Sequence, residues 1–157
     1  MTAVRTTAFK EVLSRFATGI TVVTAMEEGV PIGFTCQAFA SLSLEPPMVA
    51  LAAAKASTSW PKMARAGAFC ANILGEGQGD LAVRFSAPGD RFGGISWHAG
   101  ETGAPVLEGV LAWIECALGA IYDAGDHELV TGTVRHLGVG EGGPLLYYRR
   151  GYGRFCG

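Results

Sequence analysis

Apolar residues recur at helical spacing near the start of the chain. Between Thr7 and Ala17 they follow one another at three- and four-residue steps, at Phe9, Val12, Leu13 and Phe16. Gly19 follows, and glycine readily adopts the left-handed conformation that ends many helices. The pattern predicts an amphipathic helix over 7–17 with Gly19 as its cap.

Short runs of apolar and β-branched residues, separated by turn residues, make up most of the remaining chain. A hairpin is predicted where Ile20–Met26 and Val30–Cys36 flank the residues 27–29. Pro46 and Pro47 cannot lie inside a central strand, so they mark the entry to the next apolar run, Met48–Ala54. Further strands are predicted at 68–74, 110–122, 129–139 and 145–149, with turns at 123–126 and 140–143.

Two short helices and a long loop complete the pattern. Ser57 or Thr58 is expected to cap a helix that ends at Gly67, and a second helix is expected over 80–85. Residues 86–105 are rich in glycine, proline and charge, which predicts an irregular excursion. About six or seven strands without regular strand–helix alternation predict a mainly β, antiparallel barrel, built as one domain over 1–157.

Composition narrows the class of protein. Apolar residues make up 49% of the chain and charged residues 17%, so we expect a self-association surface. No apolar run approaches the roughly 20 residues of a membrane-spanning helix, and the start lacks the pattern of an export signal, which favours the cytoplasm. The four cysteines form no Cys-x-x-Cys pair, so free thiols are expected. A net charge of −2 gives no general attraction to nucleic acid or anionic membranes.

Three motifs are weighed and set aside. Residues 138–143 match the glycine fingerprint of dinucleotide sites, but Pro144 and a β-like run follow where a helix is required, so a turn is predicted. His98, His127 and His136 lack the spacing of metal ligands, and no metal site is expected. No serine lies in a nucleophile-elbow pattern, so hydrolysis has no support.

Small polar residues gather at 33–47 and again at 55–58. Such segments can present backbone N–H groups to a flat heterocycle, while Lys55, Ser57 and the next helix start can receive a phosphate. The alternative is an ordinary barrel corner followed by a capped helix.

With these segments the chain resembles the short flavin reductases of two-component monooxygenases, which are homodimers with the Greek-key-like FMN-binding split β-barrel fold. The resemblance runs from Phe9 to Tyr152, and within the family it is nearest to reductases that serve phenol-type and steroid-ring hydroxylases. It is carried by motifs in the same order, at 16–24, 33–47, 71–74, 84–85, 90–92, 125–127 and 144–148.

The resemblance implies roles for particular residues. The flavin ring would be lined by Phe34, Thr35, Cys36, Gln37, Ala38, Ser41 and Ser43. Its ribityl phosphate would meet Lys55, Ala56, Ser57 and Thr58, and its tail Arg84 and Phe85. His127 would be the catalytic, nicotinamide-side histidine. Many relatives carry Ala-Asn-Ser or Ala-Ser-Ser where this chain has Cys36-Gln37-Ala38. From the residues alone, Arg84 also fits a surface charge, His127 a turn residue and Cys36 a small buried hydrophobe.

The implied activity is NAD(P)H:flavin oxidoreduction. Exchangeable FMN or FAD would be reduced by NADH or NADPH, and the reduced flavin would diffuse to a partner oxygenase acting on an aromatic substrate. NADH is favoured because no basic cluster marks a pocket for the 2′-phosphate. A non-catalytic flavin-binding module and a related oxidase or deazaflavin-dependent reductase are the alternatives.

Overall fold

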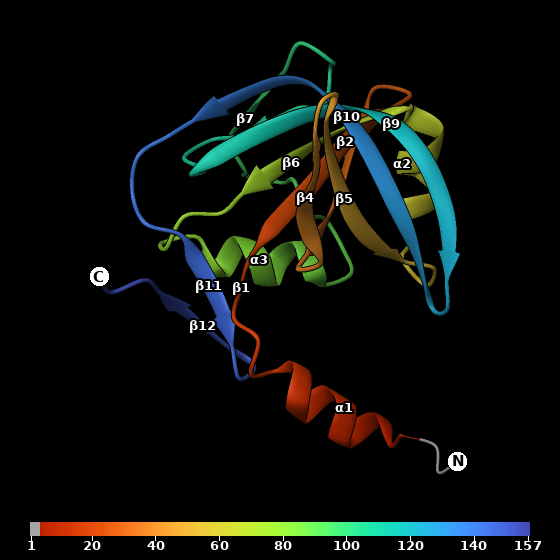
Figure 1. Cartoon of the computed structure of the whole chain (residues 1–157). Helices are drawn as coiled ribbons and strands as arrows, with labels where there is room; N and C mark the ends of the chain where they lie inside the picture. The colour runs from red at the N-terminus through yellow and green to blue at the C-terminus, as the bar shows by residue number, and fades with distance from the viewer. Residues whose placement is uncertain (1–3) are drawn as a thin grey trace.

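Antiparallel β-strands make up most of the molecule, which is a computed structural model describing residues 4–157 (Figure 1). In chain order the elements are α1 (Thr6–Leu13), β1 (Thr18–Gly19), β2 (Thr21–Glu27), β3 (Val30–Cys36), β4 (Phe39–Leu44), β5 (Pro47–Ala54), α2 (Trp60–Ala66), β6 (Ala68–Ile73), α3 (Gly79–Ser86), β7 (Trp97–Ala99), β8 (Pro105–Leu107), β9 (Ala112–Ala124), β10 (His127–Val139), β11 (Leu145–Tyr148) and β12 (Gly151–Arg154). The main sheet has the order β3-β2-β6-β9-β10-β5-β4. The predicted mainly β, antiparallel fold is confirmed.

The two edge strands of this sheet, β3 and β4, follow one another in the chain. Only Gln37 and Ala38 separate them, and the amide of Ala52 on β5 donates to the carbonyl oxygen of Ala38 at 3.0 Å. Strand β3 also comes close to β5. The sheet therefore curls on itself, and its split lies at the Gln37–Ala38 link.

In the part of the chain that the structure describes, three clusters of buried side chains fill the curled sheet and the space under its helices, and two of them are large. One gathers around Trp60 and Met63 of α2, and the other around Phe85 of α3. Strand β5 shows how the alternating pattern produces the first cluster, because Val49, Leu51 and Ala53 are buried while the residues between them are not. Burial on alternate positions fixes which face of the strand meets the core.

The long hairpin of β9 and β10 brings distant segments to one end of the molecule. Its two strands, of 13 residues each, are joined at Gly125 and Asp126, where Gly125 has φ 76°. Strand β10 pairs with β5 so that His127 lies opposite Ala54. The tip of the hairpin thus lies beside the end of β5 (Figure 1).

The helix predicted over 7–17 is shorter in the structure, and the prediction that Gly19 caps it is wrong. Helix α1 ends at Leu13, while Thr18 and Gly19 pair with Tyr147 and Leu146 of β11. Pairing with a distant strand overrides the local helical pattern, which no reading of neighbouring residues reveals.

Parts of the chain predicted as irregular or unassigned also form strands. Strand β4 runs along β5, and β12 pairs with β11. Strand β7 lies within the expected excursion over 86–105 and pairs with β8, which begins at its end. The turn at 140–143 is confirmed, since β11 and not a helix follows it. Gly67 ends α2 with φ 72°, as predicted. All four cysteines are free, as expected.

No helix among residues 4–157 is both long and apolar enough to cross a membrane. The interpretation of the chain start as lacking an export signal falls partly on Met1–Ala3, which lie outside the described residues.

Candidate functional site

Lys55 and His127, two of the predicted site residues, are far apart in the sequence but lie at the same end of the molecule. The Lys55 amide donates to the carbonyl oxygen of Asp126 at 3.0 Å, and its Nζ lies 2.5 Å from Oδ2 of Asp123. Nδ1 of His127 lies 2.7 Å from Oδ1 of Asp126, and the histidine side chain is 43% exposed. The end of β5 and the hairpin tip therefore form one polar surface with an accessible imidazole.

The side chain of Ser57 forms hydrogen bonds with the backbone at the start of α2. Its Oγ accepts the backbone N–H groups of Ser59 and Trp60, at 3.3 and 3.2 Å, so it bonds the start of α2, although the N-cap residue is Ser59 and not Ser57 or Thr58 as predicted. Ala56 and Thr58 are exposed on either side of it. Because Oγ already accepts two hydrogen bonds, the Ser57 hydroxyl can bind a ligand only by donating its proton in a hydrogen bond.

Arg91 ties three segments of the predicted site together. Its Nη1 donates to the carbonyl oxygen of Gly33 at 2.6 Å and to Oγ of Ser59 at 2.7 Å. The Thr35 hydroxyl donates to the carbonyl oxygen of Ala82 on α3 at 2.5 Å. Strand β3, the start of α2 and α3 are thereby joined. Arg91 was not among the site residues predicted from the sequence, although it lies in the motif at 90–92.

Three of the predicted flavin residues, Phe34, Cys36 and Phe85, have side chains in the core. A Cβ at residue 33 would lie 2.9 Å from Cε1 of Phe85, so Gly33 leaves the space that this ring fills. The Cys36 thiol donates to the carbonyl oxygens of Ala38 and Ala52 at 3.4 and 3.5 Å. Burial raises the pKa of this thiol to about 11, so it is protonated at neutral pH.

This burial predicts the reactivity of the thiols. With an aromatic disulfide reagent at pH 8, the folded protein should release one equivalent of reporter, from exposed Cys156, because Cys36, Cys70 and Cys116 are buried. In denaturant all four should react. Fast labelling of a second thiol in the folded protein would contradict the buried position of Cys36, and Cys156→Ser serves as the control.

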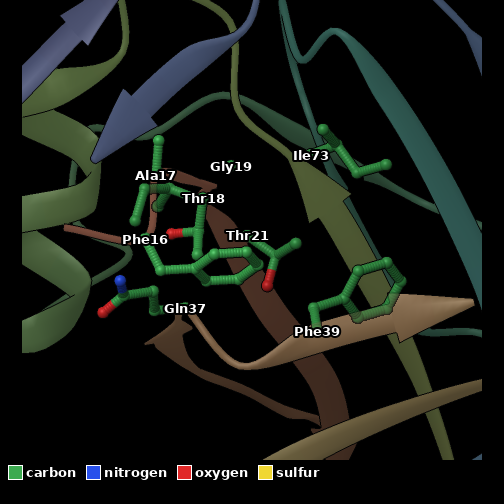
Figure 2. Close-up of a pocket in the computed structure, with 9 residues that line it drawn as sticks. Phe16, Ala17, Thr18, Gly19, Thr21, Gln37, Phe39 and Ile73 are labelled. Carbon is green, nitrogen blue, oxygen red and sulfur yellow. The ribbon is translucent and has the colours of Figure 1, made fainter. Parts of the chain in front are cut away.

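A cavity of about 300 Å³ lies beside the split in the sheet. Figure 2 shows Phe16, Thr18, Gln37 and Phe39 around it. Within residues 4–157, Oγ1 of Thr18 is the one buried side-chain polar atom without a hydrogen-bond partner. The full lining is Phe16, Ala17, Thr18, Gly19, Ile20, Thr21, Gln37, Phe39 and Ile73. An apolar wall with an unpaired hydroxyl suits a flat ligand that carries polar groups at its edge.

Sequence reasoning identified Gln37 of this cavity and missed the side contributed by 16–21. The signal for that side was the motif at 16–24, which carried the resemblance without an assigned role. Ser41 and Ser43 lie on β4, where Ser41 is exposed opposite Val49 and Ser43 is partly buried opposite Met48.

Arg84 lines a different hollow, of about 350 Å³, with Gln78, Asp80 and Glu108 among its neighbours. Its Nη2 donates to the carbonyl oxygens of Gly93 and Asp90. Of the predicted residues, Gln37 lies at the cavity, 55–58 and His127 at the hairpin tip, and Arg84 at the second hollow. The others do not line either hollow: Phe34, Cys36 and Phe85 lie in the core, and Ser41 and Ser43 lie on β4.

Helix α1 leaves its apolar face uncovered. None of its residues is buried, and Phe9 and Val12 are 56% and 67% exposed. The helix projects away from the sheet (Figure 1), and the Arg149 amide donates to the carbonyl oxygen of Ser14 just beyond its end. An exposed apolar helix face of this kind marks a surface for association.

Comparison with known proteins gives one consistent family. A family model described as flavin reductase like domain matches residues 13–155. The reductase subunit HsaB of a flavin-dependent monooxygenase from Mycobacterium tuberculosis is 46% identical over 148 residues, covering 92% of this chain and 79% of its own. Nitrilotriacetate monooxygenase component B from Mycobacterium thermoresistibile superposes with a TM-score of 0.92 at 42% identity, over 95% of this chain and 86% of its own. The NADH:FAD oxidoreductase SgcE6 from Streptomyces globisporus, in complex with NAD and FAD fragments, has a TM-score of 0.89 at 31% identity, with 96% and 92% covered.

Proposed function

Because this chain belongs to the flavin reductase-like family, we propose that it transfers hydride from a reduced nicotinamide to FMN or FAD and releases the reduced flavin. The observation that carries this proposal is the family match over residues 13–155, nearly the whole chain. The motif resemblance noted in the sequence is confirmed by the same match.

The residues present fit a flavin. A flat ring beside the Gln37–Ala38 link would meet the apolar wall of the cavity, and the unpaired hydroxyl of Thr18 and the amide of Gln37 would bond its polar edge. Backbone groups of 34–38, with Ser41 and Ser43, would continue along it. Lys55 and its loop would receive the phosphate, and Arg84 the flavin tail.

The flavin supplies the hydride acceptor and the nicotinamide the hydride donor, so the protein needs neither nucleophile nor metal of its own for this step. Its residues orient the two rings, and holding reactants in place lowers a barrier by as much as about 7 to 11 kcal/mol. Asp126 holds the ring of His127 through Nδ1, at 2.7 Å, so Nε2 would be the ring nitrogen that contacts the carboxamide of the nicotinamide.

The biological setting follows from the same proposal. HsaB is named as the reductase subunit of a flavin-dependent monooxygenase, and we propose that this chain likewise supplies reduced flavin to a separate oxygenase that acts on an aromatic substrate. The uncovered face of α1 supports a homodimer. Buried free thiols support a reducing compartment, the cytoplasm. We propose that 1–157 forms one domain.

Oxidation of NADH and NADPH followed at 340 nm, with FMN, FAD and riboflavin in turn, tests this function. We expect flavin-dependent consumption of the nicotinamide, faster with NADH, and release of the reduced flavin, which dissolved oxygen then reoxidises. Flavin binding without nicotinamide consumption would replace the proposal with a non-catalytic binding role. Binding of a deazaflavin in place of FMN and FAD would indicate the related reductases.

A further inference from the structure

Lys55, the group proposed to receive the flavin phosphate, is already paired with a carboxylate. Its Nζ lies 2.5 Å from Oδ2 of Asp123, and the two side chains are 40% and 80% exposed. The ammonium group lowers the pKa of Asp123, chiefly through this hydrogen bond, so Asp123 is ionised at neutral pH.

The surroundings of the ammonium group are acidic on balance. Asp126, in the same hairpin turn, is ionised too, and its pKa is lowered mainly by the bond to His127. Leaving His127 aside, the charged groups joined by these contacts are Lys55, Asp123 and Asp126, one positive and two negative charges. A phosphate that approaches Lys55 therefore enters a site whose net charge is negative.

We propose that Asp123 weakens the binding of the flavin 5′-phosphate by holding Lys55, so that the protein keeps its flavin loosely and releases it readily. This inference rests on the proposed function, because it assigns Asp123 an effect on the same site. If the phosphate displaces Asp123, the ion pair is lost on binding. If Lys55 bridges both groups, the carboxylate lies about 5–6 Å from the phosphate and repels it. Either arrangement lowers the affinity.

Asp123→Asn tests the inference with little disturbance of the turn. The amide oxygen of asparagine can still accept the Gly125 N–H, which the carboxylate accepts at 3.4 Å. Fluorescence titration should show FMN binding about three- to tenfold tighter than in the unaltered protein, the size expected for removing one charge at this distance in an exposed site. Riboflavin, which lacks the phosphate, should bind with unchanged affinity.

Two controls separate this effect from others. Glu141→Gln makes the same charge change in an exposed turn at the far end of β10 and should leave FMN affinity unchanged. At 1 M salt, where screening acts over about 3 Å, the gain in Asp123→Asn should largely disappear. Asp123→Ser, which also removes the charge, should reproduce the gain if the asparagine variant folds poorly.

The outcomes are distinct. Equal FMN affinity in all variants, or a matching change for riboflavin, would overturn the role of Asp123 while leaving flavin reduction intact. Failure of the unaltered protein to bind any flavin would overturn the proposed function, and the inference with it.

Discussion

Phe85→Ala is expected to lower the free energy of unfolding by about 3–5 kcal/mol, measured by urea titration. The side chain is fully buried, and its ring meets that of Phe92 edge-on at 5.0 Å. It also fills the space left above Gly33 on β3. Removal would leave a cavity beneath the strand that leads to the Gln37–Ala38 link, so flavin affinity should fall as a secondary result.

Val83→Ala is the matched control, because Val83 lies on the same helix but is 52% exposed. It should change stability by less than about 0.5 kcal/mol. A Phe85→Ala protein of unchanged stability and weakened flavin binding would instead identify Phe85 as a direct ligand contact, and would contradict its assignment to the core.

Strands with alternating or continuous apolar residues were predictable from the sequence. Strands that lack such a pattern, and form because they pair with a neighbouring strand, were not. The run Val30–Cys36 has the same bounds in the structure, because β-branched and aromatic residues there match a buried strand. Strand β4 is an exposed edge of alanine, serine and leucine that β5 stabilises by pairing. Strand β12 consists of exposed residues that pair with β11. Such pairing depends on residues far away in the sequence.

The candidate site, too, was predictable from sequence only in part. Residue types at 33–47 and 55–58 indicated polar segments, but their spatial relation depends on long-range contacts. Arg91 reaches Gly33 across 58 positions, and Lys55 reaches Asp123 across 68. Neither contact has a local signature, since exposed arginine and lysine are common on any surface. The cavity wall at 16–21 was hidden for a related reason, because its helical pattern gives way to pairing with β11.

His127→Ala is expected to raise the KM for NADH about three- to tenfold, the size expected for the loss of one hydrogen bond. Flavin affinity, measured by titration without nicotinamide, should change less than twofold, because the imidazole is directed by Asp126 at the hairpin tip and lies outside the cavity lining. The hydride step itself involves the two rings, so kcat should fall less than kcat/KM.

His136→Ala provides the matched control, since His136 is an exposed histidine on the same strand β10, nine residues further along. It should leave both the NADH dependence and the flavin affinity as they are. An unchanged KM for NADH in His127→Ala would remove the orienting role and return His127 to a turn residue. A large loss of flavin affinity would instead place the imidazole against the flavin, because an orienting contact to nicotinamide alone cannot alter binding measured in its absence.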